Sequence, residues 1–225
     1  MGGQAGGDVA SRLVMDSLAE LAPTLGGIAS APDLHEEERA TDRLTTMAEQ
    51  AHASILTHAA QHPPLYGMGT TLVMAHLLPL PKPRLLVLNV GDSRAYLVRA
   101  GTLTQLTRDH TLIEEYVRDG RLTPTQAACH PNRHVLTRAM GLAPHLESDL
   151  FSVDLLAGDL LLLCSDGLTK MLTDERILQT VRPHRHIPSL ATQALIHTAL
   201  DAGGIDNVTV VACTITEIPD QANIH

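Results

Sequence analysis

Four consecutive leucines, Leu160 to Leu163, constrain the fold of this 225-residue chain more than any other stretch. An apolar run without alternation predicts a strand that is buried on both faces, so the chain has to cover each face of it. Asp159 precedes the run, and Asp166-Gly167 follows shortly after it. A carboxylate at the end of a rigid strand, next to a glycine that permits a sharp turn, is well placed to bind a metal in a cleft. A solvated turn carboxylate is the alternative for Asp166, and for so short a motif alone it is the more common one.

Length and composition favour one soluble domain and exclude several partners. The net charge of -9 and the aromatic content of 2% argue against a nucleic-acid partner, since such partners attract basic patches and stacking rings. No apolar run approaches the ~20 residues of a membrane span, so no membrane partner is expected. Cys129, Cys164 and Cys213 are far apart and odd in number, which indicates neither a disulfide framework nor a Cys-x-x-Cys site. A reducing cytoplasm is therefore the expected location.

The periodicity of the chain predicts helices and strands in blocks. Apolar spacing predicts helices over residues 10–21 and from Asp33, where Glu36 completes a capping-box pattern, and further helices after Asp109, Thr123, Asp174 and Leu190. Strands are predicted over residues 70–78, 85–90, 95–98 and 103–106 as an antiparallel meander, over the leucine run, and over residues 207–215 as a central, buried strand. Residues 129–146 read as irregular. Helices that bracket blocks of antiparallel strands predict one α+β domain, with two sheets packed face to face and helices outside.

A second carboxylate sits in the same kind of position as Asp166. Asp206 follows Gly203-Gly204 at the start of the last strand, and Asp109 stands just before a helix. If the strands of Asp166 and Asp206 are antiparallel neighbours, the two carboxylates meet at one edge, where a cation such as Mg²⁺ or Mn²⁺ would relieve their repulsion. A turn residue is the alternative for Asp206, and a helix cap is the alternative for Asp109.

The other charged candidates are assigned to structural roles. Asp92 lies in Gly91-Asp92-Ser93, where a tight hairpin is expected to turn. Arg133, Arg138 and Lys170 could attract an anion, but such side chains are more often solvated surface charges.

Six motifs in order resemble the protein phosphatase 2C family, the metal-dependent Ser/Thr phosphatases, in its bacterial form. They are Gly67-Met-Gly-Thr-Thr71, Val90-Gly-Asp-Ser-Arg94, Thr107-Arg-Asp-His110, Arg138-Ala-Met-Gly141, Gly158 to Gly167 and Gly203-Gly-Ile-Asp-Asn-Val-Thr209. The resemblance implies an α-β-β-α fold, in which two antiparallel sheets form a sandwich flanked by helices. It also implies a site for two Mn²⁺ or Mg²⁺ ions, with a third and weaker one in bacterial members.

Specific residues acquire roles from this resemblance. Asp166 and Asp206 match metal-binding aspartates, Asp109 matches an aspartate that helps to hold the third metal, and Gly167 and Asn207 belong to the geometry of the site. Residues 120–146 match the flap region of the family. The implied chemistry is in-line attack on phosphoserine or phosphothreonine by a water that bridges two metals, without a phosphoenzyme. The implied partners are phosphorylated proteins, as substrates of a bacterial Ser/Thr kinase.

The start of the chain departs from the family pattern. Met1-Gly-Gly-Gln-Ala-Gly-Gly7 matches a family segment in which Asp-Gly precedes the methionine, and that aspartate bridges the two metals. We therefore expect residues 1–225 to be a single protein phosphatase 2C-like domain without its N-terminal segment, including the phosphate-binding arginine, and to be impaired in activity. The alternative is a pseudophosphatase that binds phosphoproteins or kinases without turnover.

Overall fold

A computed structural model describes residues 6–25, 35–80 and 82–216. The chain divides into two compact units, each assembled from three segments. The first comprises Met1–Leu72, Leu88–Asp92 and Asp109–Leu150, and the second Val73–Val87, Ser93–Arg108 and Phe151–His225. The units are described one at a time below.

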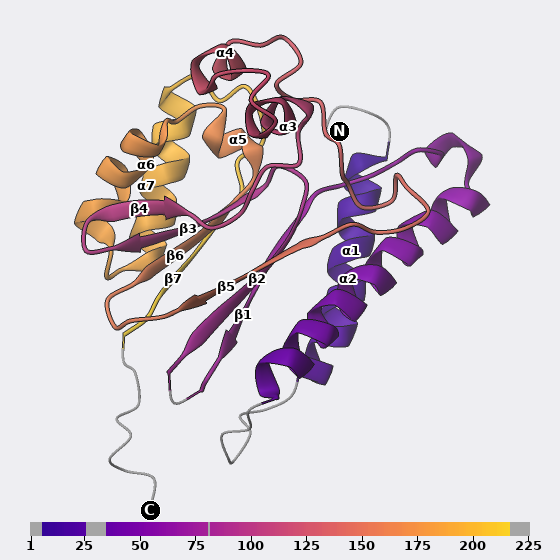
Figure 1. Cartoon of the computed structure of the whole chain (residues 1–225), viewed down its shortest axis with the longest axis horizontal. Helices are drawn as coiled ribbons and strands as arrows, with labels where there is room; N and C mark the ends of the chain where they lie inside the picture. The colour runs from indigo at the N-terminus through magenta and orange to yellow at the C-terminus, as the bar shows by residue number, and fades with distance from the viewer. Residues whose placement is uncertain (1–5, 26–34, 81, 217–225) are drawn as a thin grey trace, which may run out of the picture. The chain divides into compact units, whose positions relative to one another are not determined.

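Figure 1 shows the helices and strands of the described residues. The helices are α1 (Gly7–Leu21), α2 (Glu36–Gln61), α3 (Leu112–Arg118), α4 (Pro124–Ala128), α5 (Asp166–Thr169), α6 (Asp174–Val181) and α7 (Pro188–Asp201), with 3-10 turns η1 (Ala22–Leu25), η2 (Pro63–Leu65) and η3 (Arg182–His184). The strands are β1 (Leu72–Leu78), β2 (Arg84–Val90), β3 (Arg94–Arg99), β4 (Thr102–Gln105), β5 (Asp149–Asp154), β6 (Leu160–Cys164) and β7 (Val210–Thr214). No helix within these described ranges is long and apolar enough to cross a membrane.

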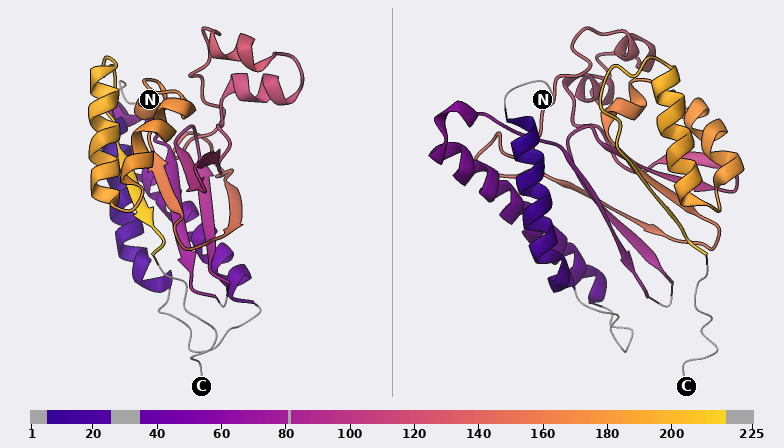
Figure 2. Two further views of the ribbon diagram at one scale, coloured as in Figure 1. Left: turned by 90° about the vertical axis from the view of Figure 1, so that its left-hand side faces the viewer. Right: turned by 180° about the vertical axis from the view of Figure 1, so that it is seen from behind.

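The first unit is built on α1 and α2, which pack side by side, as the right-hand view of Figure 2 shows. The predicted apolar stripe of α2 is confirmed, because its five residues are all buried: Leu44, Met47, Ala48, Ala51 and Ile55. On α1, Ala10 and Val14 are buried, as a helix of this amphipathic pattern requires. The predicted cap at Asp33 lies outside the described residues, and α2 begins at Glu36.

The second unit contains a β-sandwich, which confirms the predicted fold class. One sheet has the order β1-β2-β5 and the other β4-β3-β6-β7, and β6 lies between β3 and β7 with antiparallel pairing on both sides. Alternate leucines of β6 point to opposite faces. Leu161 and Leu163 join Leu85 and Val87 in the apolar layer between the sheets.

Helices cover the outer face of the four-stranded sheet. Leu160, Leu162 and Cys164 of β6 pack in one apolar cluster with Ile177 of α6 and Leu195 of α7. Figure 1 shows α6 and α7 on this side of β4, β3, β6 and β7. The leucine run is thus buried on both faces, as predicted, because each face of β6 meets a different apolar layer.

The predicted four-stranded meander is wrong. β2 and β3 belong to different sheets, and β3 pairs with β4 and β6 instead. Gly91 in the turn between them has a φ of 106°, which favours glycine, and an added Cβ would overlap the side chain of Thr71. The turn at Gly91-Asp92-Ser93 is present, but it changes sheet rather than forming a hairpin.

Two further strands differ from prediction. β5 was missed, because its short pattern Asp-Leu-Phe-Ser-Val-Asp follows a long irregular stretch. β7 is an edge strand that pairs only with β6 in the sheet order, and Val211 is 55% exposed. The prediction of a central strand was wrong because an apolar run does not reveal whether a strand has one neighbour or two.

Candidate metal-binding site

The pairing of β6 with β7 brings Asp166 and Asp206 to one edge of the four-stranded sheet. The two strands are antiparallel, with Cys164 opposite Val210. Asp166 follows the end of β6 as the first residue of α5, and Asp206 precedes the start of β7. The predicted juxtaposition of these two carboxylates is therefore present in the second unit.

A backbone clamp fixes the segment that carries Asp206. Ser165 donates its N–H to the carbonyl of Thr209 at 3.1 Å, and its hydroxyl accepts the N–H of Thr209 at 3.1 Å and donates to the carbonyl of Asn207 at 3.3 Å. A Cβ added at Gly167 would overlap that same carbonyl of Asn207. Only glycine at position 167 allows this close approach, which explains the motif physically.

Lys170 binds both carboxylates. Its ammonium Nζ lies 2.6 Å from Asp166 Oδ2 and 2.7 Å from Asp206 Oδ2. The interpretation of Lys170 as a solvated surface charge was wrong, since its side chain is only 21% exposed. The spacing of four residues between Asp166 and Lys170 was the available signal, because such pairs lie on one helical face.

The electrostatics of this cluster shift two of its pKa values. Burial acts to lower the pKa of Lys170, but the hydrogen bonds to Asp166 and Asp206 outweigh it and raise that pKa. The hydrogen bond from Lys170, with that from the Asn207 N–H to Oδ1 at 2.8 Å, lowers the pKa of Asp206. Both shifts favour the charged forms around neutral pH.

The donor set of the pair fits a hard divalent cation. Two carboxylate oxygens already converge on one positive group, and all-oxygen ligation suits Mg²⁺ or Mn²⁺. Across the described part of the chain, no group of three or more His, Cys, Asp or Glu side chains is arranged to hold a metal ion. A divalent cation bound by Asp166 and Asp206 would therefore need further ligands besides these two carboxylates.

Asp109 belongs to the first unit. It does not cap the following helix, because the N-cap of α3 is Thr111, whose hydroxyl accepts the N–H of Glu114 at 3.2 Å. The role of Asp109 as a metal ligand remains a prediction.

A buried network surrounds the residue after Asp109. The N–H of Gly91 donates to His110 Nδ1 at 3.1 Å, so the proton of the neutral ring is on Nε2, which faces Asp149 Oδ2 at 3.4 Å. Burial lowers the pKa of His110, and the nearby Asp149 opposes this only in part. Arg138 Nη1 binds Asp149 Oδ1 at 2.8 Å, so Arg138 is not the free surface charge that the sequence suggested. Burial acts to raise the pKa of Asp149, but His110 and Arg138 outweigh it and lower that pKa.

The region predicted as a flap is mostly irregular, apart from α4. The capping box of α4 is confirmed, with Thr123 and Gln126 exchanging both hydrogen bonds. His52 of α2 fixes the far end of the region, because its ring accepts the N–H of Gly141 at 3.0 Å and donates to the carbonyl of Ala143 at 2.9 Å. Within the same unit, Arg138 and Glu147 line a cavity of about 200 Å³.

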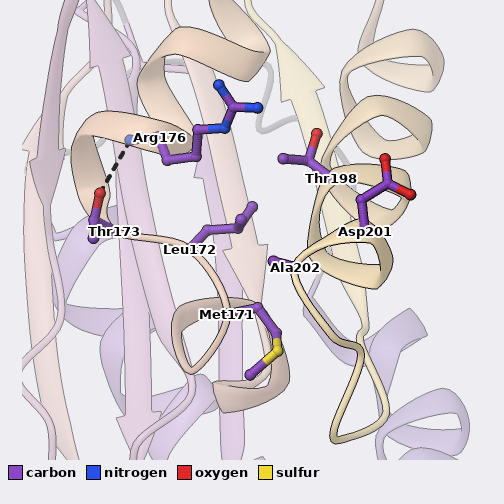
Figure 3. A pocket seen from close by; sticks show the side chains of 7 residues that line it. All are labelled: Met171, Leu172, Thr173, Arg176, Thr198, Asp201 and Ala202. Atoms are coloured by element: carbon purple, nitrogen blue, oxygen red, sulfur yellow. Dashed lines mark hydrogen bonds between the residues drawn. The ribbon is translucent and has the colours of Figure 1, made fainter.

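Figure 3 shows a second cavity, which belongs to the second unit. It has a volume of about 370 Å³ and is lined by the segment that follows Lys170 and by the end of α7 that precedes Asp206: Met171, Leu172, Thr173, Arg176, Thr198, Asp201 and Ala202. The figure shows the hydroxyl of Thr173, the N-cap of α6, accepting the backbone N–H of Arg176.

The sequence profile of the family described as Protein phosphatase 2C matches residues 1–201. The chain belongs to the protein phosphatase 2C family. Among named relatives of this family, serine/threonine protein phosphatase PstP of Mycobacterium tuberculosis is 39% identical over 222 residues, and serine/threonine phosphatase stp of Listeria welshimeri is 35% identical over 211 residues. The matches cover 96% and 94% of this chain, and 39% and 80% of the relatives. The chain thus spans well under half of the length of PstP.

Solved structures of the same family share the fold. The crystal structure of PstP superimposes with a TM-score of 0.77 at 37% identity, covering 96% of this chain and 86% of the other. Stp1 from Staphylococcus aureus gives a TM-score of 0.82 at 32% identity, with 96% and 81% covered. The catalytic domain of PstP has also been solved in complex with two manganese ions, at 37% identity and a TM-score of 0.76, with 96% and 85% covered.

Proposed function

We propose that this chain is a metal-dependent protein serine/threonine phosphatase that hydrolyses phosphoserine and phosphothreonine. The observation that carries the proposal is the convergence of Asp166 and Asp206 on one cationic group at the β6–β7 edge of a protein phosphatase 2C chain. The names of the relatives, serine/threonine phosphatases, support the same reaction.

Asp166 and Asp206 are the proposed metal ligands, and Asp109 is a further one. Mn²⁺ or Mg²⁺ is the proposed cofactor, supported by the two manganese ions of the PstP complex and by the oxygen donors here. Divalent cations held by these residues would neutralise phosphoryl oxygens and lower the pKa of a bound water, so that no side-chain nucleophile would be needed. The residues of the chain hold the carboxylates in register: Ser165 and Gly167 clamp Asn207, and the Asn207 N–H orients Asp206.

The proposed substrates are proteins phosphorylated by a bacterial Ser/Thr kinase, with residues 120–146 as the flap that contacts them. The exposed, irregular chain around α4 supports this role, since loops held on a rigid scaffold commonly carry recognition. Cys129, Cys164 and Cys213 all lie in the described part of the chain and form no disulfide there, which supports a cytoplasmic location.

We further propose that residues 1–225 alone turn over substrate slowly. Support comes from the described residues, where Asp166 and Asp206 have no third His, Cys, Asp or Glu in a metal-binding arrangement with them. The alternative, a module that binds phosphoproteins or kinases without hydrolysis, draws on the same observation.

The test is hydrolysis of a phosphothreonine peptide by the purified chain in Mn²⁺, in Mg²⁺ and in EDTA. We expect slow turnover that depends on the metal and falls on the order of 100-fold in Asp166→Asn, because a ligand is lost. Asp201→Asn makes the same chemical change on α7 and should leave the rate unchanged. Turnover that persists in EDTA would contradict the proposal, and peptide binding without any turnover would favour the binding module.

A further inference from the structure

We propose that Lys170 is an internal counter-cation of the Asp166–Asp206 pair and competes directly with divalent cations for it. The inference rests on the proposed function in one respect, namely that Mn²⁺ or Mg²⁺ is the ligand of the pair. It assigns to this chain a residue that sets the affinity for the metal without being a ligand.

The position of Lys170 in the fold brings its ammonium group into contact with both carboxylates. Lys170 is the C-cap of α5, one turn after Asp166, and its backbone N–H donates to the Asp166 carbonyl at 2.8 Å. With the backbone fixed in this way, Nζ reaches Asp166 Oδ2 at 2.6 Å and Asp206 Oδ2 at 2.7 Å. One ammonium therefore joins the end of β6 to the segment that leads into β7.

Lys170 binds an oxygen of Asp206 that is also available to a metal. Asp206 Oδ1 accepts the N–H of Asn207 at 2.8 Å, and Lys170 binds the other oxygen, Oδ2, at 2.7 Å. An ammonium and a divalent cation on the same oxygens would stand within a few Å of each other and repel strongly. Binding of a divalent cation by both carboxylates therefore requires Lys170 to withdraw, which its flexible four-carbon stem allows.

Two consequences follow for the protein. The affinity for divalent cations is lower than the same carboxylates would give without Lys170, because each metal-binding event breaks two ion pairs. In the absence of metal, Lys170 neutralises the repulsion between Asp166 and Asp206 and keeps the pair assembled.

The first test is a Mn²⁺ titration of the chain, with free Mn²⁺ measured by its electron paramagnetic resonance signal. Lys170→Met should lower the Kd for Mn²⁺ about tenfold, which corresponds to about 1.4 kcal/mol. Lys170→Arg keeps the charge and should stay close to the wild type. Lys82→Met is the matched control, since Lys82 is exposed and is the only other lysine of the chain.

The second test measures the contact itself and needs no turnover. An amine-reactive ester is applied to the chain, and the labelling of Lys170 relative to Lys82 is read by peptide mass spectrometry. In EDTA, Lys170 should react several-fold more slowly than Lys82, and both Mn²⁺ and the double variant Asp166→Asn/Asp206→Asn should raise its reactivity toward that of Lys82.

The outcomes separate this proposal from the proposed function. If the wild type binds Mn²⁺ and Lys170→Met binds it no more tightly, competition by Lys170 is overturned while the phosphatase assignment stands. If Lys170 labels equally in wild type and double variant in EDTA, the ion pairs are overturned. If neither wild type nor Lys170→Met binds Mn²⁺ at millimolar concentration, both proposals fail together.

Discussion

The buried carboxylate of Asp159 is stabilised by its hydrogen-bond partners. Its carboxylate is 1% exposed and accepts hydrogen bonds from Arg99 Nε at 2.8 Å, Arg99 Nη2 at 2.6 Å and the Leu156 N–H at 2.8 Å. The sequence marks Asp159 only as the residue before the leucine run, and it cannot show that Arg99 of β3 lies beside it. A bidentate, buried pair of this kind is costly to break on one side, because the remaining charge stays desolvated.

Replacing Arg99 by Met should therefore destabilise the chain by about 3 kcal/mol or more. Arg84→Met is the matched control, because Arg84 pairs with the largely exposed Asp154 and should cost at most about 1 kcal/mol. Urea unfolding followed by circular dichroism gives both values. Equal losses of unfolding free energy in the two variants would show that the ion pair of the buried Asp159 contributes no more to stability than the exposed one.

His110 should make stability depend on pH. Its pKa is lowered in the folded protein, so the unfolded chain takes up the proton first, near the usual value of about 6.5. The contribution of neutral His110 to the free energy of unfolding is thus fully present above that pH. It is lost as the pH falls through the lowered folded pKa, and the free energy of unfolding then decreases by up to about 1.4 kcal/mol per pH unit.

His110→Asn, whose Oδ1 can accept the Gly91 N–H as Nδ1 does, should flatten the fall in stability between pH 6.5 and 5. Unfolding in metal-free buffer over this range measures the slope. The exposed His145 supplies the control variant His145→Asn, which should keep the slope of the wild type. An unchanged slope in His110→Asn would contradict a buried neutral imidazole.

Helices and strands were predictable where the signal lies within a short stretch of sequence. The stripe of α2, the capping box of α4 and the double-sided burial of β6 follow from spacing that any short window reveals. Sheet membership is not local: the change of sheet at Gly91, the edge position of β7 and the existence of β5 depend on pairing between distant residues. For the same reason the site was predicted in part, with Asp166 and Asp206 found and Lys170 missed.

The contact between Gly167 and Asn207 gives the sharpest prediction for the elements of the site. Gly167→Ala should push the Asn207 carbonyl away, displace Asp206 and weaken Mn²⁺ binding, with a loss of stability of about 1–3 kcal/mol. Gly158→Ala is a useful contrast, since nothing lies within 4 Å of an added Cβ there and its cost comes from the positive φ of 88° alone.

Calorimetric titration with Mn²⁺ and thermal unfolding compare the two glycine variants. Gly158→Ala should lose some stability and keep the Mn²⁺ affinity of the wild type. If Gly167→Ala also keeps that affinity, the clamp does not position Asp206.

At the scale of the whole molecule, motif order was more informative than any single residue. The protein phosphatase 2C family and its sandwich fold were predicted from six short motifs, and the family match over residues 1–201 confirms the family. What the sequence could not supply is side-chain geometry, because the distance from Lys170 to each carboxylate depends on the pairing of β6 with β7. The net charge of -9 does not locate a cation site either, because acidic side chains bind a cation only where the fold brings them close together.

The central claim is that Asp166 and Asp206 together form a divalent-cation site. An equilibrium titration of Mn²⁺ into the wild type, Asp166→Asn, Asp206→Asn and the control Asp201→Asn tests it most directly. We predict that each variant of the pair weakens Mn²⁺ binding by at least about tenfold, as loss of a charged ligand requires, while Asp201→Asn binds like the wild type. Unchanged Mn²⁺ affinity in either Asp166→Asn or Asp206→Asn would contradict the account.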